Sequence, residues 1–182
     1  MDHADHVGLL REGVVESGGT WADLGAGRGA FTLALAELLG PGAVVYAVDR
    51  DRRALAELER AMAARFPETT LHCRAADLTQ PLDLPPLDGV VMANSLHFVR
   101  YSEQEAVIRL VGGHLRVGGR LILVEYSLDR VNPWVPYPLA YSSWEELARR
   151  VGFASTHLLR TRPSRTLGEI YSAVSRQPVE NE

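Results

Sequence analysis

The feature that most constrains this chain is an alternation of strand-like and helix-like segments that begins near residue 20. The first apolar run, 20–24, leads into the glycine-rich turn Gly25-Ala-Gly-Arg-Gly29, and residues 29–39 follow with helical spacing of apolar side chains. Strands that alternate with helices run parallel, are joined by right-handed crossovers and carry helices on both faces. The sequence therefore predicts an α/β fold with a doubly wound, mostly parallel sheet.

The remaining elements follow from the same periodicities, because continuous apolar runs indicate buried strands. The expected strands cover 43–48, 69–75, 87–93 and 120–126, and the expected helices cover 51–65, 103–116 and 143–151, the last with Ser142 or Ser143 as its N-cap. Two more strand-like runs, near 153–161 and 168–175, have no helix between them. They should pair as an antiparallel C-terminal hairpin and complete a seven-stranded sheet.

Length and composition fit a single domain over residues 1–182, of which 46% are hydrophobic and 23% charged. We expect an N-terminal helix over 1–17 and a frayed tail over 177–182. The link 77–86 is short and rich in proline, so it is not expected to hold a full helix.

Charge and cysteine content exclude several classes of protein. The formal net charge of -4 argues against a partner held mainly through phosphate contacts, so nucleic acid is not the expected partner. The single cysteine, Cys73, excludes an intrachain disulfide and a multi-cysteine metal site. No segment approaches the length of a membrane-spanning helix, and the N-terminus does not have the pattern of a signal peptide. We expect a cytoplasmic protein with no membrane partner and no metal.

Polar side chains follow four of the predicted strands at the point where each strand ends. Asp23 closes the first strand and Asp49 the second, Asp77 follows the third, and Asn94 follows the fourth. In open α/β sheets, ligands bind beyond the carboxyl ends of the strands, near the point where the strand order reverses. A carboxylate buried there without a partner is unfavourable. A ligand rich in hydrogen-bond donors would satisfy several of these side chains together.

The glycine-rich turn supports the same interpretation. Glycines let the backbone approach a ligand closely, and the next helix offers free amides at its N-terminus. Asp49 lies twenty residues beyond Gly29, where a ribose-binding acid belongs in such folds. The alternatives left open are that Asp23 and Asp49 are helix caps and that Asp77 and Asn94 are turn residues.

Together these motifs resemble those of class I S-adenosylmethionine-dependent methyltransferases. The similarity covers roughly residues 5–175. The matching stretches, in chain order, are Asp23-Leu-Gly-Ala-Gly-Arg-Gly29, Val45-Tyr-Ala-Val-Asp49, Ala75-Ala-Asp77, Asp88-Gly-Val-Val-Met-Ala-Asn94-Ser-Leu-His97 and Leu115-Arg-Val-Gly-Gly-Arg-Leu-Ile-Leu-Val-Glu125.

The resemblance implies S-adenosyl-L-methionine as cofactor and S-adenosyl-L-homocysteine as product. It implies that the methionine part is held by Asp23 and by the backbone of Gly25, Ala26 and Gly27. It further implies that Asn94 lies near the methionine end of the cofactor and the reacting methyl group.

The resemblance assigns the nucleoside part of the cofactor to other residues. Asp49 would accept both ribose hydroxyls, and Arg50 would lie against the adenine. Asp77, with the amide of Leu78, would contact the adenine edge.

Methyl transfer from a sulfonium is an in-line displacement, to which an enzyme contributes mainly alignment and exclusion of water. A general base is needed only if the acceptor must lose a proton. His97 is the first candidate, three residues past Asn94, and Glu125 is the second. The alternatives are a packed histidine and a buried structural acid.

Two additions to the shared core could select the acceptor. The insert 132–141 is stiffened by three prolines. We expect its aromatic side chains to bind a small-molecule acceptor, namely Trp134, Tyr137 and Tyr141. The alternative is that the insert only packs over the sheet edge. The N-terminal helix, which carries His3 and His6, is expected to lie over the cofactor cleft rather than to bind a metal. The closing hairpin carries a cluster of three arginines, Arg160, Arg162 and Arg165. We expect a solvated hairpin tip, with contact to an anionic substrate or RNA as the alternative.

Two other functions compete with a methyltransferase. A nicotinamide-dependent oxidoreductase would share the first strand and Asp49, but the glycine spacing is G-x-G-x-G rather than G-x-G-x-x-G, and the chain has no lysine for a Tyr-x-x-x-Lys pair. A catalytically silent binding module would keep the same cofactor motifs. The sequence leaves open the methyl acceptor and the oligomeric state, with a homodimer as one option.

Overall fold

The computed structural model describes residues 1–128, 131–164 and 168–179. Its centre is a seven-stranded sheet in the order β3-β2-β1-β4-β5-β7-β6. The strands are β1 (Thr20–Leu24), β2 (Val44–Asp49), β3 (Thr70–Ala75), β4 (Leu87–Ala93), β5 (Leu115–Ser127), β6 (Ser155–Pro163) and β7 (Glu169–Arg176). The helices are α1 (His3–Leu10), α2 (Ala30–Leu39), α3 (Arg52–Arg65), α4 (Tyr101–Gly112) and α5 (Tyr141–Val151), with the 3-10 turn η1 (Leu96–Phe98).

The strand directions confirm the predicted doubly wound sheet. β1 pairs in parallel with both β2 and β4, and the parallel pairing continues to β3 on one side and β5 on the other. β7 pairs antiparallel with β5 and with β6, which is the expected C-terminal hairpin. The strand order reverses at β1, so a ligand crevice is expected between the ends of β1 and β4.

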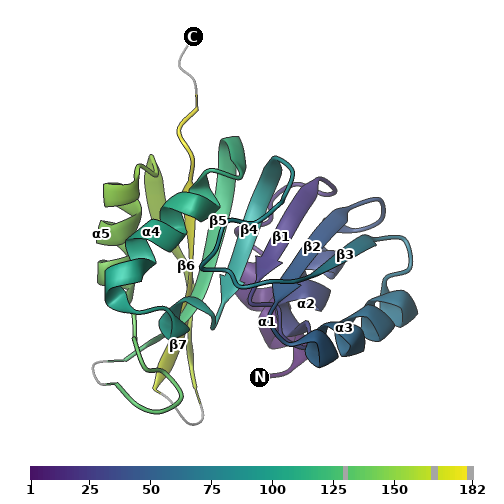
Figure 1. Cartoon of the computed structure of the whole chain (residues 1–182), viewed down its shortest axis with the longest axis horizontal. Coiled ribbons are helices and arrows are strands. Elements are labelled where there is room, and N and C mark those ends of the chain that lie inside the picture. The colour runs from purple at the N-terminus through teal and green to yellow at the C-terminus, as the bar shows by residue number, and fades with distance from the viewer. Residues whose placement is uncertain (129–130, 165–167, 180–182) are drawn as a thin grey trace.

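Helices cover both faces of this sheet (Figure 1). α1, α2 and α3 pack on one face, and α4 and α5 pack on the other around the buried Trp144. The link 77–86 between β3 and β4 contains no helix, as its prolines predicted. None of the helices in the described part of the chain is both long and apolar enough to cross a membrane.

Several boundaries differ from the sequence prediction. α4 ends at Gly112, before the expected 116, and β5 begins at Leu115 instead of 120. The register between β4 and β5 shifts by several residues near Gly118, whose φ of 70° is left-handed, so the glycine pair forms an irregularity inside the strand. The predicted serine N-cap of α5 is wrong, because the capping residue is Ala140, without a side-chain cap.

The N-terminal helix is shorter than the predicted 1–17 and begins with a capping box formed by Asp2 and Asp5. α1 packs against α2 and β6. Its histidines have separate partners: His3 Nε2 lies 2.7 Å from Glu37 Oε2, and the His6 ring packs edge-on against Phe31. α1 lines no part of the cavity described below, so its role as a cover over the cleft stays a prediction.

The arginine cluster of the hairpin holds α1 in place. Arg162 forms an ion pair with Asp5, and Arg160 Nη1 donates to Gly8 O at 3.4 Å. Both side chains remain exposed, as expected for a solvated hairpin, while Arg165 lies outside the described residues. The tail is partly fixed, since Gln177 Nε2 donates to Gly112 O at 2.9 Å, and residues 180–182 also lie outside the described part.

Close packing between β1 and β4 gives the first prediction. A Cβ on Gly89 would lie 2.3 Å from the buried Trp21 ring, so Gly89→Ala forces the ring or the strand to move. We expect a loss of about 1–3 kcal/mol in the free energy of unfolding, measured by urea denaturation. Gly113→Ala is the control, because its backbone is right-handed and a Cβ there meets only ordinary contacts. Equal stability of the two variants would contradict the packing argument.

Candidate active site

A cavity of about 280 Å³ opens at the carboxyl ends of β1, β2 and β4. It contains several of the residues predicted to bind the cofactor, namely Gly25, Asp49, Arg50, Asp77, Leu78 and Asn94. Its remaining lining residues are Val48, Ala76, Thr79, Ser95, Phe98 and Val99. Polar side chains that follow three separate strands thus surround one space, as expected from their positions at the strand ends.

The glycine-rich turn is fixed to β2 by its backbone. The amides of Gly25 and Ala26 donate to Val48 O at 2.8 and 3.0 Å. Gly25 has a φ of 84°, and a Cβ there would lie 2.4 Å from Ser95 Cβ. Glycine is therefore required both by the backbone conformation and by the close approach of the segment after β4.

Asp49 lies at the end of β2 and does not cap α3. Its Oδ2 accepts from the Gly27 amide at 2.8 Å, and its Oδ1 accepts from the Asp51 amide at 2.8 Å. The cap is Asp51, which accepts from the amides of Arg53 and Ala54. The cap alternative for Asp49 is therefore wrong, and its carboxylate joins the glycine turn to the cavity.

Asp23 is a buried acid with one hydrogen-bonding side chain. It is 1% exposed, and Thr32 Oγ1 donates to its Oδ2 at 2.6 Å. Burial raises the pKa of Asp23 to about 7, with a further increase from the charge of Asp49, while the Thr32 hydrogen bond opposes the shift. The cap of α2 is Gly29, so the cap alternative for Asp23 is also wrong. Asp23, like Ala26 and Gly27, is not among the residues that line the cavity.

Asp77 and Arg50 form the outer wall. Asp77 Oδ1 accepts from the amide and the hydroxyl of Thr79 at 2.9 and 2.8 Å, and these hydrogen bonds lower the pKa of Asp77. Arg50 Nη1 lies 3.7 Å from Asp77 Oδ2, and both side chains are well exposed. Such a pair contributes little to stability, so both side chains can turn toward a ligand at small cost.

Asn94 and Ser95 carry two buried oxygens that no described residue satisfies. Asn94 Oδ1 and Ser95 Oγ lack hydrogen-bond partners, and Asn94 has a left-handed φ of 52°. A buried polar atom without a partner is unfavourable, so two neighbouring ones beside a cavity indicate ligand contacts. The donors and acceptors of a nucleoside-bearing amino acid would fit them. The prediction did not include Ser95, whose only signal was its place beside Asn94 opposite a glycine.

His97 and Glu125 form a buried pair next to this cavity. Glu125 is fully buried, and its Oε1 accepts from the amides of Leu96 and His97 at 3.0 and 3.1 Å. Its Oε2 lies 2.5 Å from His97 Nδ1. The His97 side chain is 3% exposed, and neither residue lines the cavity. The contact fixes the orientation of the imidazole and leaves Nε2 without a hydrogen-bond partner among the described residues.

Aromatic rings surround the imidazole. The Phe98 ring lies 4.3 Å from the His97 ring, and the Tyr126 ring lies 6.3 Å away. Phe98 is 57% exposed and lines the cavity, so one face of this cluster is open to a ligand.

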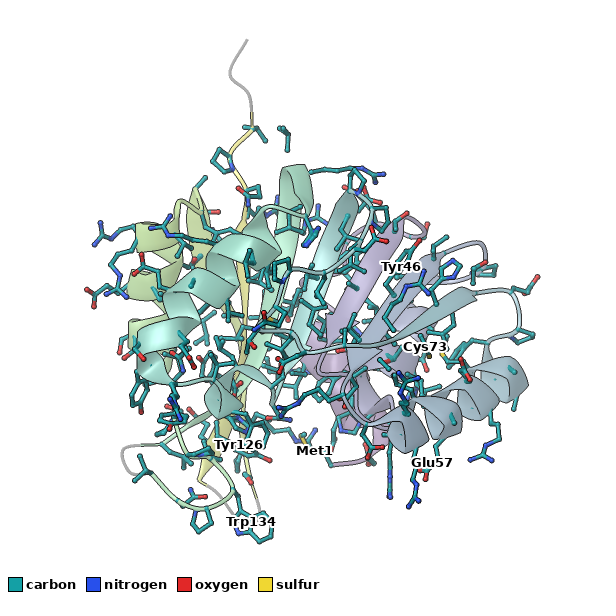
Figure 2. The ribbon with its side chains drawn as sticks, in the orientation of Figure 1. Met1, Tyr46, Glu57, Cys73, Tyr126 and Trp134 are labelled. Carbon is teal, nitrogen blue, oxygen red and sulfur yellow. The ribbon has the colours of Figure 1, made fainter. Side chains whose placement is uncertain are left out.

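The insert predicted to bind the acceptor is fixed to three elements. The Tyr137 amide donates to His97 O at 3.0 Å, and the hydroxyls of Tyr101 and Tyr171 donate to the carbonyls of Pro138 and Leu139. Figure 2 shows Trp134 at the outer tip, beyond Tyr126, and its side chain is 75% exposed.

The three aromatic residues of the insert do not line the cavity. Tyr141 instead donates to Glu145 Oε1 at 3.0 Å, within α5. The role of Trp134, Tyr137 and Tyr141 in binding an acceptor stays a prediction.

Comparisons with known proteins show which family the chain belongs to. Residues 22–119 match the family model described as a methyltransferase domain. Small-subunit ribosomal RNA methyltransferase H of Acidobacterium capsulatum is 32% identical over 114 residues, which cover 54% of this chain and 38% of that protein. The chain therefore spans well under half the length of this curated relative.

Solved structures share the fold. A candidate O-methyltransferase from Nostoc punctiforme has a TM-score of 0.76 at 20% identity, covering 97% of this chain and 57% of its own. An S-adenosylmethionine-dependent methyltransferase from Methanosarcina mazei has a TM-score of 0.68 at 16% identity, covering 93% and 97%. Magnesium protoporphyrin IX methyltransferase from Synechocystis, solved with bound S-adenosylmethionine, has a TM-score of 0.69 at 23% identity, covering 94% and 77%.

The burial of Asp23 predicts a pH-dependent stability. Asp23 binds its proton more tightly in the folded than in the unfolded protein. The protonated side chain therefore contributes stability that is complete below pH 3.8 and is lost as the pH rises through about 7. Asn cannot ionise, so the Asp23→Asn variant does not lose this stability at high pH. We expect its stability relative to wild type to be higher at pH 8 than at pH 5 by about 2–3 kcal/mol in urea denaturation.

The exposed Glu12 provides the control for this measurement, since Glu12→Gln should show no such difference. A gain for Asp23→Asn that is equal at both pH values would contradict the buried-charge explanation.

The unsatisfied Ser95 hydroxyl predicts a contribution to cofactor binding. Ser95→Ala should weaken binding of S-adenosylmethionine about 5- to 30-fold in calorimetry, because it removes one hydrogen bond of about 1–2 kcal/mol. The thermal stability of the ligand-free protein should not fall, since the hydroxyl has no partner there. A variant that binds normally but unfolds earlier would assign Ser95 to packing.

Proposed function

The chain belongs to the methyltransferase domain family and is a class I S-adenosylmethionine-dependent methyltransferase, and from that premise we propose that it methylates a hydroxyl group of a small-molecule acceptor, with His97 as general base. The observation that carries the proposal is the contact of His97 Nδ1 with the buried Glu125 carboxylate at 2.5 Å. An oriented imidazole beside the cofactor cavity is useful to an acceptor that must lose a proton.

The residues of the cavity fit S-adenosylmethionine. Bound in this cavity, the cofactor supplies an activated methyl group on a positively charged sulfur. Asp49 would hold the ribose, and Asp77 and Arg50 would lie at the adenine end. Asp23 would stabilise the methionine ammonium group from behind the glycine turn, and Asn94 would contact the same end. The unsatisfied oxygen of Asn94 supports this assignment.

His97 would act through Nε2, because Nδ1 is held by Glu125. A carboxylate at Nδ1 keeps that nitrogen protonated and stabilises the imidazolium that forms when Nε2 takes a proton. Glu125 is thus a positioning residue, and its two backbone contacts hold it in place while the imidazole changes charge. Because the His97 side chain is itself 3% exposed, water would have little access to the proton transfer.

A flat acceptor would suit the open side of this site. Phe98 presents an exposed ring at the cavity, and the neighbouring insert displays Trp134. Two of the structures with the same fold have names that describe a candidate O-methyltransferase and a methyltransferase of magnesium protoporphyrin IX, which is a flat molecule. These features support a small aromatic or conjugated acceptor.

Ribosomal RNA is the second candidate acceptor, because the curated relative is named as a ribosomal RNA methyltransferase. The net charge of -4 is unfavourable for phosphate contacts. Arg160 and Arg162 are exposed to a polyanion, but both already contact α1.

A direct assay tests the proposal. The protein is incubated with S-adenosylmethionine and a panel of phenols, catechols, conjugated carboxylic acids, amines and small-subunit ribosomal RNA, and acceptor-dependent formation of S-adenosylhomocysteine is measured. Turnover of a hydroxyl acceptor supports the proposal. Turnover confined to the carboxylic acids, the amines or the RNA would overturn it.

The proposed base gives a quantitative prediction. His97→Gln should lower kcat about 10²- to 10⁴-fold with a hydroxyl acceptor while binding of S-adenosylmethionine is retained, because general base catalysis contributes about this much. Glu125→Gln should lower kcat less, because the amide can still hold the imidazole at Nδ1.

The exposed His157 supplies the control, and His157→Gln should leave kcat unchanged. If His97→Gln turns over at the wild-type rate with its cofactor bound, His97 is a packed histidine and not the base.

A further inference from the structure

The single hydrogen bond from Thr32 to Asp23 is a feature that the function above does not use. Both side chains are almost completely buried, and the Oγ1–Oδ2 distance is 2.6 Å. No other described side chain or amide donates to this carboxylate. Thr32 belongs to the first turn of α2, directly after the glycine-rich turn, so the backbone that forms the cofactor site also sets the position of the hydroxyl.

The elements packed against Asp23 contribute one other charge. Asp49 at the end of β2 is the charged group that acts on Asp23, and its effect disfavours ionisation. On β4 the residue paired with Asp23 is the apolar Val91. On α1 two titratable side chains contact α2, namely His6, which packs on Phe31, and His3, which pairs with Glu37. Thr32 is therefore the one described group that favours the carboxylate form of Asp23.

We propose that Thr32 is a positioning residue that keeps Asp23 ionised and aligned for the α-ammonium group of the cofactor, and so sets the lower pH limit of S-adenosylmethionine binding. The inference rests on the proposed function, which places the methionine part of the cofactor at Asp23. It adds a role for Thr32, which neither the cofactor motifs nor the cavity lining includes.

Only the ionised form of Asp23 is suited to bind the ammonium group of the cofactor. A carboxylate pairs with an ammonium group, whereas a carboxylic acid does not gain this charge interaction. Burial raises the pKa of Asp23 to about 7, so its protonation falls within the range of ordinary assays. Loss of a hydrogen bond donated to a charged group moves such a titration by about one unit. Without the hydroxyl, the ionised form appears only at higher pH.

The ligand provides an internal reference. Its own α-amino group loses a proton near the ordinary α-amino pKa of about 7.7–8.0. Affinity should therefore rise with pH as Asp23 ionises and fall again as the ligand loses its charge. The acid limb belongs to the protein and the alkaline limb to the free ligand, so a change at Thr32 should move only the acid limb.

The experiment is titration calorimetry with S-adenosylmethionine between pH 5.5 and pH 9 on the full-length protein. Thr32→Val removes the hydroxyl and keeps the shape, and its acid limb should move up by about one pH unit, with binding up to about tenfold weaker below the limb. Thr32→Ser keeps the hydroxyl and should behave as wild type. Asp23→Asn should lose the acid limb altogether, and adding Thr32→Val to it should change nothing further.

The outcomes separate the two ideas. An unmoved acid limb in Thr32→Val, or weakening by the same factor at every pH, gives Thr32 a packing role and overturns the inference. An equal shift in Thr32→Ser also overturns it. If Asp23→Asn keeps the wild-type acid limb, Asp23 is not the group that titrates, and the proposed placement of the methionine part at Asp23 is overturned together with the role of Thr32. Thermal unfolding of each variant checks that it is folded, and Thr32→Ala replaces Thr32→Val if the valine variant is not.

Discussion

The parallel pairing of β1 with both β2 and β4 is the constraint on which the site depends. It brings the ends of three strands to one edge, so that Asp23, Asp49 and Asn94 meet although they are far apart in the chain. Gly25 completes the arrangement, because the backbone there can turn with φ 84° and let the segment after β4 approach closely. A side chain at Gly25 would separate the two halves of the crevice.

The site stores unfavourable interactions that a ligand can relieve. Asp23 is a carboxylate without a cation, and Asn94 and Ser95 carry buried oxygens without partners in the described chain. Each lowers the stability of the ligand-free protein, since buried polar groups lose their contacts with water. The same groups gain most when a cation with several donors is bound. Glu125 differs, because the His97 ring and two amides already satisfy it.

The sequence predicted the parts of the fold and site that depend on local pattern. The strand ends, the glycine turn and the hairpin follow from periodicity and turn chemistry, and the acids follow from their positions after apolar runs. The pairing of Glu125 with His97 joins residues 28 apart in the chain, and no local signal reports it. The contacts of Arg160 and Arg162 with α1 likewise arise only from tertiary packing, although both side chains stay exposed as the sequence predicted.

The two halves of the crevice are built by different kinds of interaction, and this decides how each can vary. The cofactor half is held by backbone contacts of the glycine turn, so its geometry follows from a short motif. In the proposed function the acceptor half depends on the insert, whose residues 137–139 are fixed by bonds from η1, α4 and β7. Because these three bonds involve the insert's backbone, side chains at its tip can change without releasing the wall beside His97. Under the proposed function, a substitution at Trp134 would therefore alter acceptor preference while the geometry of His97 and Glu125 is preserved.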